Sequence, residues 1–296
     1  MGRTLLIVLL GFATSFGILA QSKNRRMIES VDRMVEHYAT YTIRNTSNSG
    51  AYLALNKLYL NPSWNTGFSN LFIGEDSLVV GVTSGGANLI YVTSKAYNGY
   101  SMDSVQVALF NAEFSDFAVW TKDSTVTNVT VKDSSNNNDS SLLKTNAPFM
   151  PNIDYDALAA AATSQSQYYA GDLSASDHYP NNSFYYASTT PNVTVVKGDL
   201  DVALSATVYG IFVVEGDVVL HSDSFVRGVI YLPNASSTVT NAGLLDDATV
   251  RGAVVLRGEM DGGLQGITVR HWPEYVRPFV NYFVPSNPPI HVLSWN

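Results

Sequence analysis

The feature that most restricts the fold of this chain is an uncharged apolar run near its N-terminus, from Leu5 to Ala20. It reads LLIVLLGFATSFGILA, with Arg3 before it and three basic residues soon after it. The run is compatible with a Sec signal peptide, which is removed, or with a retained membrane anchor slightly shorter than the ~20 residues of a comfortable span. In either case the segment needs an apolar environment.

The residues after the apolar run continue a helical pattern without a break. Apolar residues recur at spacings of three and four, and charged residues fill the opposite face. The apolar positions are Met27, Val31, Met34, Val35, Tyr38 and Tyr41, and the charged ones are Glu29, Asp32, Arg33 and Glu36. We therefore predict one helix from about Thr4 to about Arg44, apolar all round at first and amphipathic later. The segment NTSNSG, Asn45 to Gly50, predicts a break or kink after it, and Asn61-Pro62-Ser63 is expected to end the helical region.

The middle of the chain changes to a period of two, which predicts strands. Three short strands separated by Gly-containing turns are expected at residues 77–83, 88–94 and 103–110. Their order after the helix predicts an antiparallel meander. The polar low-complexity segment Asp133 to Ser141 is the expected domain boundary, and Asp154 to Ala162 is predicted as a short helix.

The second half of the chain contains a repeat of 18 residues. VVKGDLDVALSATVYG, from Val195 to Gly210, aligns with VVEGDVVLHSDSFVRG, from Val213 to Gly228, and a third unit ends at Gly252. Short Val-rich strands closed by glycine at a fixed period predict a β-solenoid. Stacked turns then supply a core that no single turn can form. The alternative is a pair of ordinary hairpins with chance similarity.

Several segments resemble type IV pilins. An apolar helix that leads into an amphipathic half is typical of that family, and Asn48 to Leu58, NSGAYLALNKL, is similar to the end of the helix in PilX-like pilins and pseudopilins. The repeats resemble a bactofilin-like module of several PilX-like proteins, which is entered through a segment similar to PFMPNIDYDALAAAA. The family usually carries a glutamate as the fifth mature residue. Here that residue is Leu5, which leaves major or minor status open.

Patterns and resemblance together predict an α+β fold with a long N-terminal helix, an antiparallel pilin-type sheet and a C-terminal β-solenoid-like domain. The expected division is 1–60 for the assembly helix, 61–132 for the sheet domain, 133–193 for a polar linker with a short helix, and 194–296 for the solenoid-like domain. The resemblance also implies that Met1 is the first mature residue, with a leader peptide already removed.

The resemblance implies a structural subunit of an extracellular bacterial filament with a role in adhesion or surface attachment. Before assembly it would sit in the inner membrane, and the pilus assembly machinery would then polymerise it with other copies of itself. The expected assembly residues are Leu5, Leu6, Ile7, Val8, Leu9, Leu10, Phe12, Phe16, Ile18 and Leu19. Two alternatives stay open. One is a low-copy tip pilin whose solenoid is an adhesin, and the other is a Sec-exported carbohydrate-binding or carbohydrate-active protein.

Composition and motifs argue against other classes of function. A formal net charge of −8 and the lack of a long Lys/Arg stripe disfavour nucleic-acid binding. The chain has no cysteine, which excludes disulfides, thiol catalysis and thiolate metal sites. Its five histidines have no metal-ligand spacing, and no nucleophile elbow, P-loop or dinucleotide motif occurs. We therefore expect no catalytic residue, no metal and no cofactor.

Two further sets of polar residues are candidate sites. Asp199, Asp201 and Asp217 lie near the predicted solenoid turns, where turn hydrogen bonding is favoured over a cation site. Glycosylation sequons occur about as often as expected by chance in a chain so rich in Asn, Ser and Thr, so they permit modification without requiring it. They begin at Asn45, Asn128, Asn138, Asn181, Asn192 and Asn234.

Overall fold

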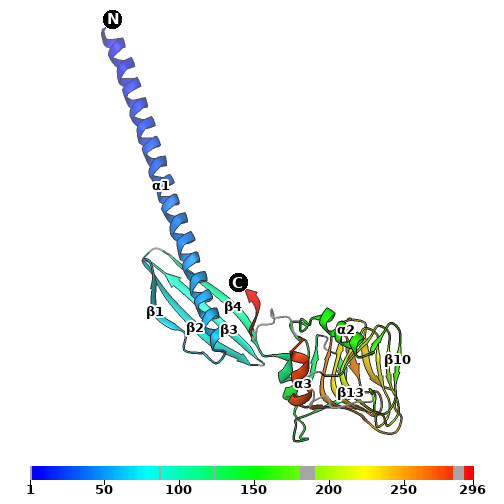
Figure 1. The fold of residues 1–296 in the computed structure, drawn as a ribbon. Coiled ribbons are helices and arrows are strands. Elements are labelled where there is room, and N and C mark those ends of the chain that lie inside the picture. The colour runs from blue at the N-terminus through cyan, green and yellow to red at the C-terminus, as the bar shows by residue number, and fades with distance from the viewer. Residues whose placement is uncertain (1, 87, 100, 123–124, 181–190, 283–289) are drawn as a thin grey trace. The chain divides into compact units, whose positions relative to one another are not determined.

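The computed structural model describes residues 2–86, 88–99, 101–122, 125–180, 191–282 and 290–296. The chain forms two compact units. The first contains Met1–Asn111 together with Ile290–Asn296, and the second contains Ala112–Pro289. The predicted α+β fold is confirmed, because the first unit holds a long helix and an antiparallel sheet while the second is a β-solenoid of about seven turns (Figure 1).

The first unit begins with a single helix, α1 (Gly2–Leu60), of 59 residues. At 1.5 Å of rise per residue it is about 90 Å long. Its C-terminal part lies along the sheet, and its N-terminal part projects beyond the sheet (Figure 1). The predicted helix is confirmed, but its predicted end at Arg44 and the predicted break at Asn45–Gly50 are wrong.

The helix continues through the predicted break because the sheet supplies partners for its polar residues. Ser, Thr and Asn usually weaken helices by competing for backbone hydrogen bonds. Here the Thr46 hydroxyl donates to Asp76 Oδ2 at 2.7 Å, and the Ser47 hydroxyl donates to Asp103 Oδ2 at 2.9 Å. At Gly50 a Cβ atom would overlap side chains of the sheet, so glycine lets the helix approach it closely.

The sheet of the first unit has five antiparallel strands in the order β1-β2-β3-β4-β20. They are β1 (Phe68–Ile73), β2 (Asp76–Gly86), β3 (Leu89–Tyr97), β4 (Met102–Asn111) and β20 (Ile290–Trp295). The three predicted strands correspond to β2, β3 and β4. The fully buried core between helix and sheet consists of Ile43, Ala51, Ala54 and Leu58 on α1 with Leu78, Val92, Ala96, Val107 and Leu109 on the sheet.

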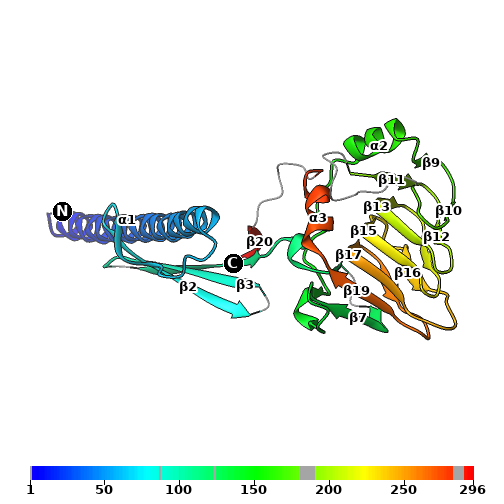
Figure 2. The same ribbon diagram turned by 60° about the horizontal axis from the view of Figure 1, so that its bottom comes forward.

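The second unit stacks short parallel strands into two sheets that enclose one core (Figure 2). One sheet contains β5 (Val119–Thr121), β7 (Val129–Lys132), β8 (Leu143–Lys144), β9 (Tyr168–Tyr169), β11 (Val193–Val196), β13 (Thr207–Val214), β15 (Phe225–Leu232), β17 (Ala248–Leu256) and β19 (Ile267–His271). The other contains β6 (Val126–Thr127), β10 (Leu173–Ala175), β12 (Leu200–Val202), β14 (Val218–Leu220), β16 (Thr238–Asn241) and β18 (Glu259–Asp261).

The register of these strands confirms the 18-residue repeat. Val195 pairs with Val213 and Val196 with Val214 in parallel, while Gly228 pairs with a corner glycine on each side. Val196 and Val214 belong to the inner core. Val195 and Val213 are equally buried, on the opposite face of the same sheet.

Helices cover part of the outer face of the solenoid. They are α2 (Tyr155–Ser164) and α3 (Pro273–Val280), and two short 3₁₀ turns lie at Phe114–Asp116 and Ser140–Leu142. The predicted helix at Asp154–Ala162 is confirmed as α2, which packs against β11, while α3 packs against β15 and β17. Asp154 caps α2, because its Oδ1 accepts a hydrogen bond from Ala157 N at 2.9 Å.

The boundaries of the two units differ from the expected 61–132, 133–193 and 194–296. Strands β5, β6 and β7 pair with β17, β18 and β19, so residues 112–132 complete the solenoid instead of extending the first sheet. The expected linker 133–193 also belongs to the second unit, and residues 290–296 return to the first. Pairings between segments more than 100 residues apart leave no local repeat in the sequence, which is why they escaped prediction.

Candidate assembly surface

The N-terminal part of α1 presents a continuous apolar surface. All ten residues expected at the assembly contact are exposed, with fractions from 52% at Val8 to 72% at Ile7. They are Leu5, Leu6, Ile7, Val8, Leu9, Leu10, Phe12, Phe16, Ile18 and Leu19. Monomeric soluble proteins rarely expose contiguous apolar patches larger than a few hundred Å², so a surface of this kind marks a contact with lipid or protein.

By length and composition α1 is able to cross a membrane. Its most apolar window of 18 residues has a mean hydropathy of 1.9, and none of that window is buried within the chain. The core helix of a soluble protein would be mostly buried, whereas a signal sequence passes the same test of length and composition. The remaining interpretations of this segment are thus a membrane anchor, an assembly helix or a signal sequence.

A narrower apolar stripe follows on the same helix. It contains Met27, Val31, Met34, Tyr38 and Tyr41, each more than half exposed. Their spacing alternates between four and three residues, which is the pattern of a helix that packs along a seam against other helices. The flanking surface is charged, and Arg25 Nε lies 3.5 Å from Glu29 Oε1. Because of those charges, this stripe suits a protein partner better than the interior of a membrane.

The free energy available from covering the ten apolar residues is large. Full burial of a Val, Leu, Ile or Phe side chain stabilises by about 1.5–3 kcal/mol. At the exposures observed, ten residues amount to roughly 10–20 kcal/mol before the loss of conformational entropy on ordering is subtracted. Such a term is sufficient to hold a subunit in a bilayer or in a bundle of helices.

The sequons occupy varied positions. Asn45, Asn128, Asn138 and Asn234 are exposed and Asn192 is half-buried, while Asn181 lies outside the described residues. Two of the side-chain amide nitrogens that would carry a glycan already donate hydrogen bonds to the backbone. Asn128 Nδ2 donates to the Gly263 carbonyl at 2.9 Å, and Asn234 Nδ2 donates to the Glu215 carbonyl at 2.6 Å. These two asparagines therefore have a structural role in connecting consecutive turns.

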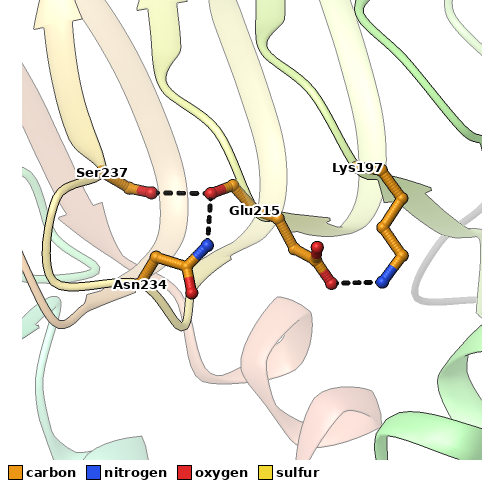
Figure 3. Close-up of polar contacts among 4 residues, drawn as sticks. All are labelled: Lys197, Glu215, Asn234 and Ser237. Carbon is orange, nitrogen blue, oxygen red and sulfur yellow. Dashed lines mark hydrogen bonds and ion pairs between the residues drawn. The ribbon is translucent and has the colours of Figure 1, made fainter.

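Glu215 links three turns of the solenoid (Figure 3). Its backbone carbonyl accepts hydrogen bonds from Asn234 and from the Ser237 hydroxyl, the latter at 2.9 Å, while its carboxylate pairs with Lys197. The hydrogen bond to Glu215 raises the pKa of Lys197 well above its usual range. Lys197 and Glu215 are equivalent residues of the repeat, so the ion pair joins adjacent turns.

The aspartates near the turns form a ladder along the solenoid. Asp172 Oδ1 accepts from the Asp199 backbone N–H at 2.9 Å, Asp199 Oδ1 from that of Asp217 at 2.8 Å, and Asp217 Oδ1 from that of Thr238 at 2.7 Å. The predicted turn role of Asp199 and Asp217 is confirmed. Strands β10, β12 and β14, which follow these aspartates, are only three residues long, so backbone N–H groups at each turn lack a partner in the neighbouring strand. The aspartate carboxylates accept hydrogen bonds from these N–H groups.

The third aspartate singled out in the sequence, Asp201, lies 3.3 Å from His221 Nε2. Across the described parts of the chain, His, Asp and Glu side chains do not gather in groups of three or more that would hold a metal ion. The structure thus offers no set of described residues around which a metal-dependent reaction could be derived.

One set of polar residues is brought together by strand pairing. Arg227 and Arg251, each followed by a corner glycine, are joined by Arg270 and Lys132 in one row across adjacent strands. The repeated Arg-Gly dipeptide was the available signal for the first two. The position of Lys132 beside Arg270 could not be predicted from the sequence, because it depends on the pairing of β7 with β19.

The chain was compared with models of known protein families, with curated proteins and with solved structures, and none of the three comparisons gave a match.

Proposed function

We propose that this chain is a structural subunit of an extracellular bacterial filament of the type IV pilus kind, polymerised through the N-terminal half of α1. The observation that carries the proposal is the exposed apolar surface from Leu5 to Leu19, which belongs to the same continuous helix that is anchored under the sheet. A subunit with this form has a folded body and a long helix whose apolar half is exposed among the described residues.

The continuity of α1 favours retention of the apolar segment. A signal-peptide cleavage after Ala20 would cut within an unbroken helix, about 20 residues before its first buried residue, Ile43. The stripe from Met27 to Tyr41 would then be left as an exposed helical end with no membrane segment to precede it. If the segment is retained, both parts of the helix can be buried. Leu5 to Ala20 is buried in lipid or in the core of a helix bundle, and the stripe from Met27 to Tyr41 packs against other helices.

The proposed course of assembly follows from where each surface can be buried. Leu5 to Ala20 lies in the inner membrane before assembly and then packs against the helices of neighbouring copies. The stripe from Met27 to Tyr41 contacts the same neighbours outside the lipid. The pilus assembly machinery transfers the subunit from one environment to the other, and the two β units face outward. The proposal assigns the chain a structural role and no catalytic one.

Two alternatives are separable by direct measurement. Leu5, in place of the family's usual glutamate, favours a low-copy tip subunit whose solenoid is an adhesin, and labelling along isolated filaments distinguishes a tip position from a uniform one. A Sec-exported carbohydrate-binding or carbohydrate-active protein would lose the apolar run. A native N-terminus at Gln21 in mass spectrometry would exclude the filament proposal.

The test of the proposal is Leu9→Asp in the full chain. A charge at the centre of an apolar helix costs roughly 2.5–3.5 kcal/mol on insertion scales, and it would also meet apolar neighbours in an assembled bundle. Leu9 is 62% exposed and lies outside the buried core of the first unit, so we expect both units to stay folded while filaments disappear from sheared-surface preparations in electron microscopy.

The matched control is Leu60→Asp, which makes the same exchange on the same helix at a residue 74% exposed beside the sheet. We expect this control to form filaments at the wild-type level. Wild-type filaments from Leu9→Asp would show that the apolar half of α1 is not the assembly element.

A further inference from the structure

A row of positive charges runs across the strands of the solenoid on its outer face. Arg227, Arg251, Arg270 and Lys132 are in register on β15, β17, β19 and β7, and we call these four residues the cation row. Neighbouring strands are about 4.8 Å apart, so the four residues are spaced regularly along the solenoid axis. All four are half-buried.

Among the described residues the cation row has no ion-pair partner, although the carboxylate of Asp133 attracts Arg270 from beyond ion-pairing distance. The Nε atoms of Arg227, Arg251 and Arg270 are buried without a hydrogen-bond partner. Arg270 donates through Nη2 to the Ser134 carbonyl, which carries no net charge.

Aromatic rings hold the guanidinium groups in place instead. Arg227 and Arg251 lie over the Phe225 ring at 5.1 and 5.4 Å from its centroid. Arg251 and Arg270 lie over the Trp272 ring at 4.8 and 4.9 Å. Each of these two rings therefore contacts two arginines, and these contacts hold the three guanidinium groups in position before any ligand binds.

The electrostatic consequence is repulsion within the row. Burial lowers the pKa of Arg251, and the like charges of Arg270 and Arg227 lower it further. In a chain with a net charge of −8, a local line of cations that repel one another is a field to which an anion would be attracted. Uncompensated like charges on adjacent strands destabilise a sheet, so a bound anion would also stabilise the solenoid.

We propose that the cation row binds an acidic polysaccharide of uronate type, laid along the solenoid axis. The planar fork of arginine matches a carboxylate with two parallel hydrogen bonds. The strand spacing of about 4.8 Å is close to the advance of one sugar ring along a chain, so a chain along the solenoid axis stays in step with the row. In an extended chain with two-fold screw symmetry the carboxylates on one side recur at every second ring, so they meet alternate members of the row. The hydroxyl of Thr249, on the same face two residues before Arg251, is placed beside the row for a sugar hydroxyl.

The aromatic contacts favour a polysaccharide over single-stranded nucleic acid. Sequence-independent binding of a nucleic-acid strand relies on aromatic faces that are free to stack on bases. In the cation row the rings of Phe225 and Trp272 are already occupied by guanidinium groups. What remains for a ligand is the set of guanidinium donors, which bind anionic groups, while neither ring is left free to stack on a base. This inference concerns the second unit and does not depend on filament formation.

The test is a binding titration of the full chain in non-ionic detergent with oligogalacturonate and with its fully methyl-esterified form, which has the same backbone without charge. We expect binding of the acid, weakening as salt is added, and none of the ester. In Arg227→Gln/Arg251→Gln/Arg270→Gln we expect a loss in affinity of roughly tenfold or more. The control is Lys95→Gln/Lys122→Gln/Arg257→Gln, which removes the same charge from exposed residues outside the row and should bind as wild type.

Three results would overturn the proposal. They are absence of binding to the acid, equal loss of affinity in the row and control variants, and tighter binding of oligothymidine that depends on the row. Replacement of the three arginines by lysine keeps the charges and removes the fork. If the glutamine variant fails to fold by circular dichroism, this lysine variant carries the test, and an affinity equal to wild type would count against carboxylate recognition by arginine.

Discussion

Gly228→Val is the substitution that most directly tests the solenoid, because Gly228 lies at a corner where two constraints coincide. Its φ angle is +152°, in the left-handed half of conformational space that favours glycine. A Cβ atom there would lie well inside van der Waals distance of the Gly210 carbonyl oxygen on the adjacent strand. The same crowding recurs at Gly252 against the carbonyl of Gly228, so the corner glycines form a continuous stack.

The expected loss of stability follows from these two terms. A β-branched residue in a sparsely populated region of φ costs about 1–3 kcal/mol, and overpacking costs a further 1–3 kcal/mol. For a unit of roughly 180 residues, each kcal/mol shifts the midpoint of thermal unfolding by about 2–4 °C. We therefore expect the midpoint of the second unit to fall by about 5–20 °C, while that of the first unit stays unchanged.

The assay is scanning calorimetry, which records thermal unfolding and can resolve the separate transitions of two compact units. The control is Gly171→Val, at an exposed glycine of the same unit whose added Cβ would have no neighbour within 4 Å. A Gly228→Val protein that unfolds within about 2 °C of this control would refute the close stacking of the corner glycines.

Two further predictions concern the carboxylates of Asp76, which is buried, and Asp177, which is hydrogen-bonded. Asp76, 3% exposed, accepts from Thr46 Oγ1 at 2.7 Å and from Asn98 Nδ2 at 2.9 Å. Asp76→Ala removes the acceptor of both hydrogen bonds and should lower the stability of the first unit by about 2–4 kcal/mol in urea unfolding, with no change in the second. The Thr207 backbone N–H, 2.8 Å from Asp177 Oδ1, holds the pKa of Asp177 below its ordinary value. The carboxylate of Asp177 therefore contributes fully to the stability of the second unit at a pH above about 4, its pKa in the unfolded chain. This contribution is lost as the pH falls through the lower pKa that Asp177 has in the folded unit. Asp177→Asn should make the melting temperature of the second unit less dependent on pH below about 4, and an unchanged pH profile would contradict this assignment.

Elements with a local period were predictable from the sequence. The helix, the strands β2 to β4 and the stacking of Val195 on Val213 each depend on a pattern that repeats within a few residues or at 18 residues. The turn role of Asp217 was predictable as well, since a carboxylate that follows glycine at a strand end finds a backbone donor in the next turn.

Other features depended on contacts that the local pattern does not contain. The segment around Thr46 and Ser47 has the composition of a helix break, but carboxylates from β2 and β4 satisfy its hydroxyls and the helix continues. The last strand, β20, returns to the first sheet, where Trp295 Nε1 donates to Asn48 Oδ1 at 2.9 Å across 247 residues of sequence. Neither contact has a signature near its own position in the chain.

The amino-acid sequence by itself determined where apolar surface exists, because periodicity of hydrophobic residues is a property of neighbouring positions. It thus specified a long apolar helix and a stack of Val-rich turns. Tertiary structure alone decided how distant segments pair. It placed residues 112–132 within the solenoid and brought Arg227, Arg251, Arg270 and Lys132 into one row. Parallel strands pair through backbone groups that every residue carries, so the choice of partner depends on the packing of the whole unit and not on any local motif.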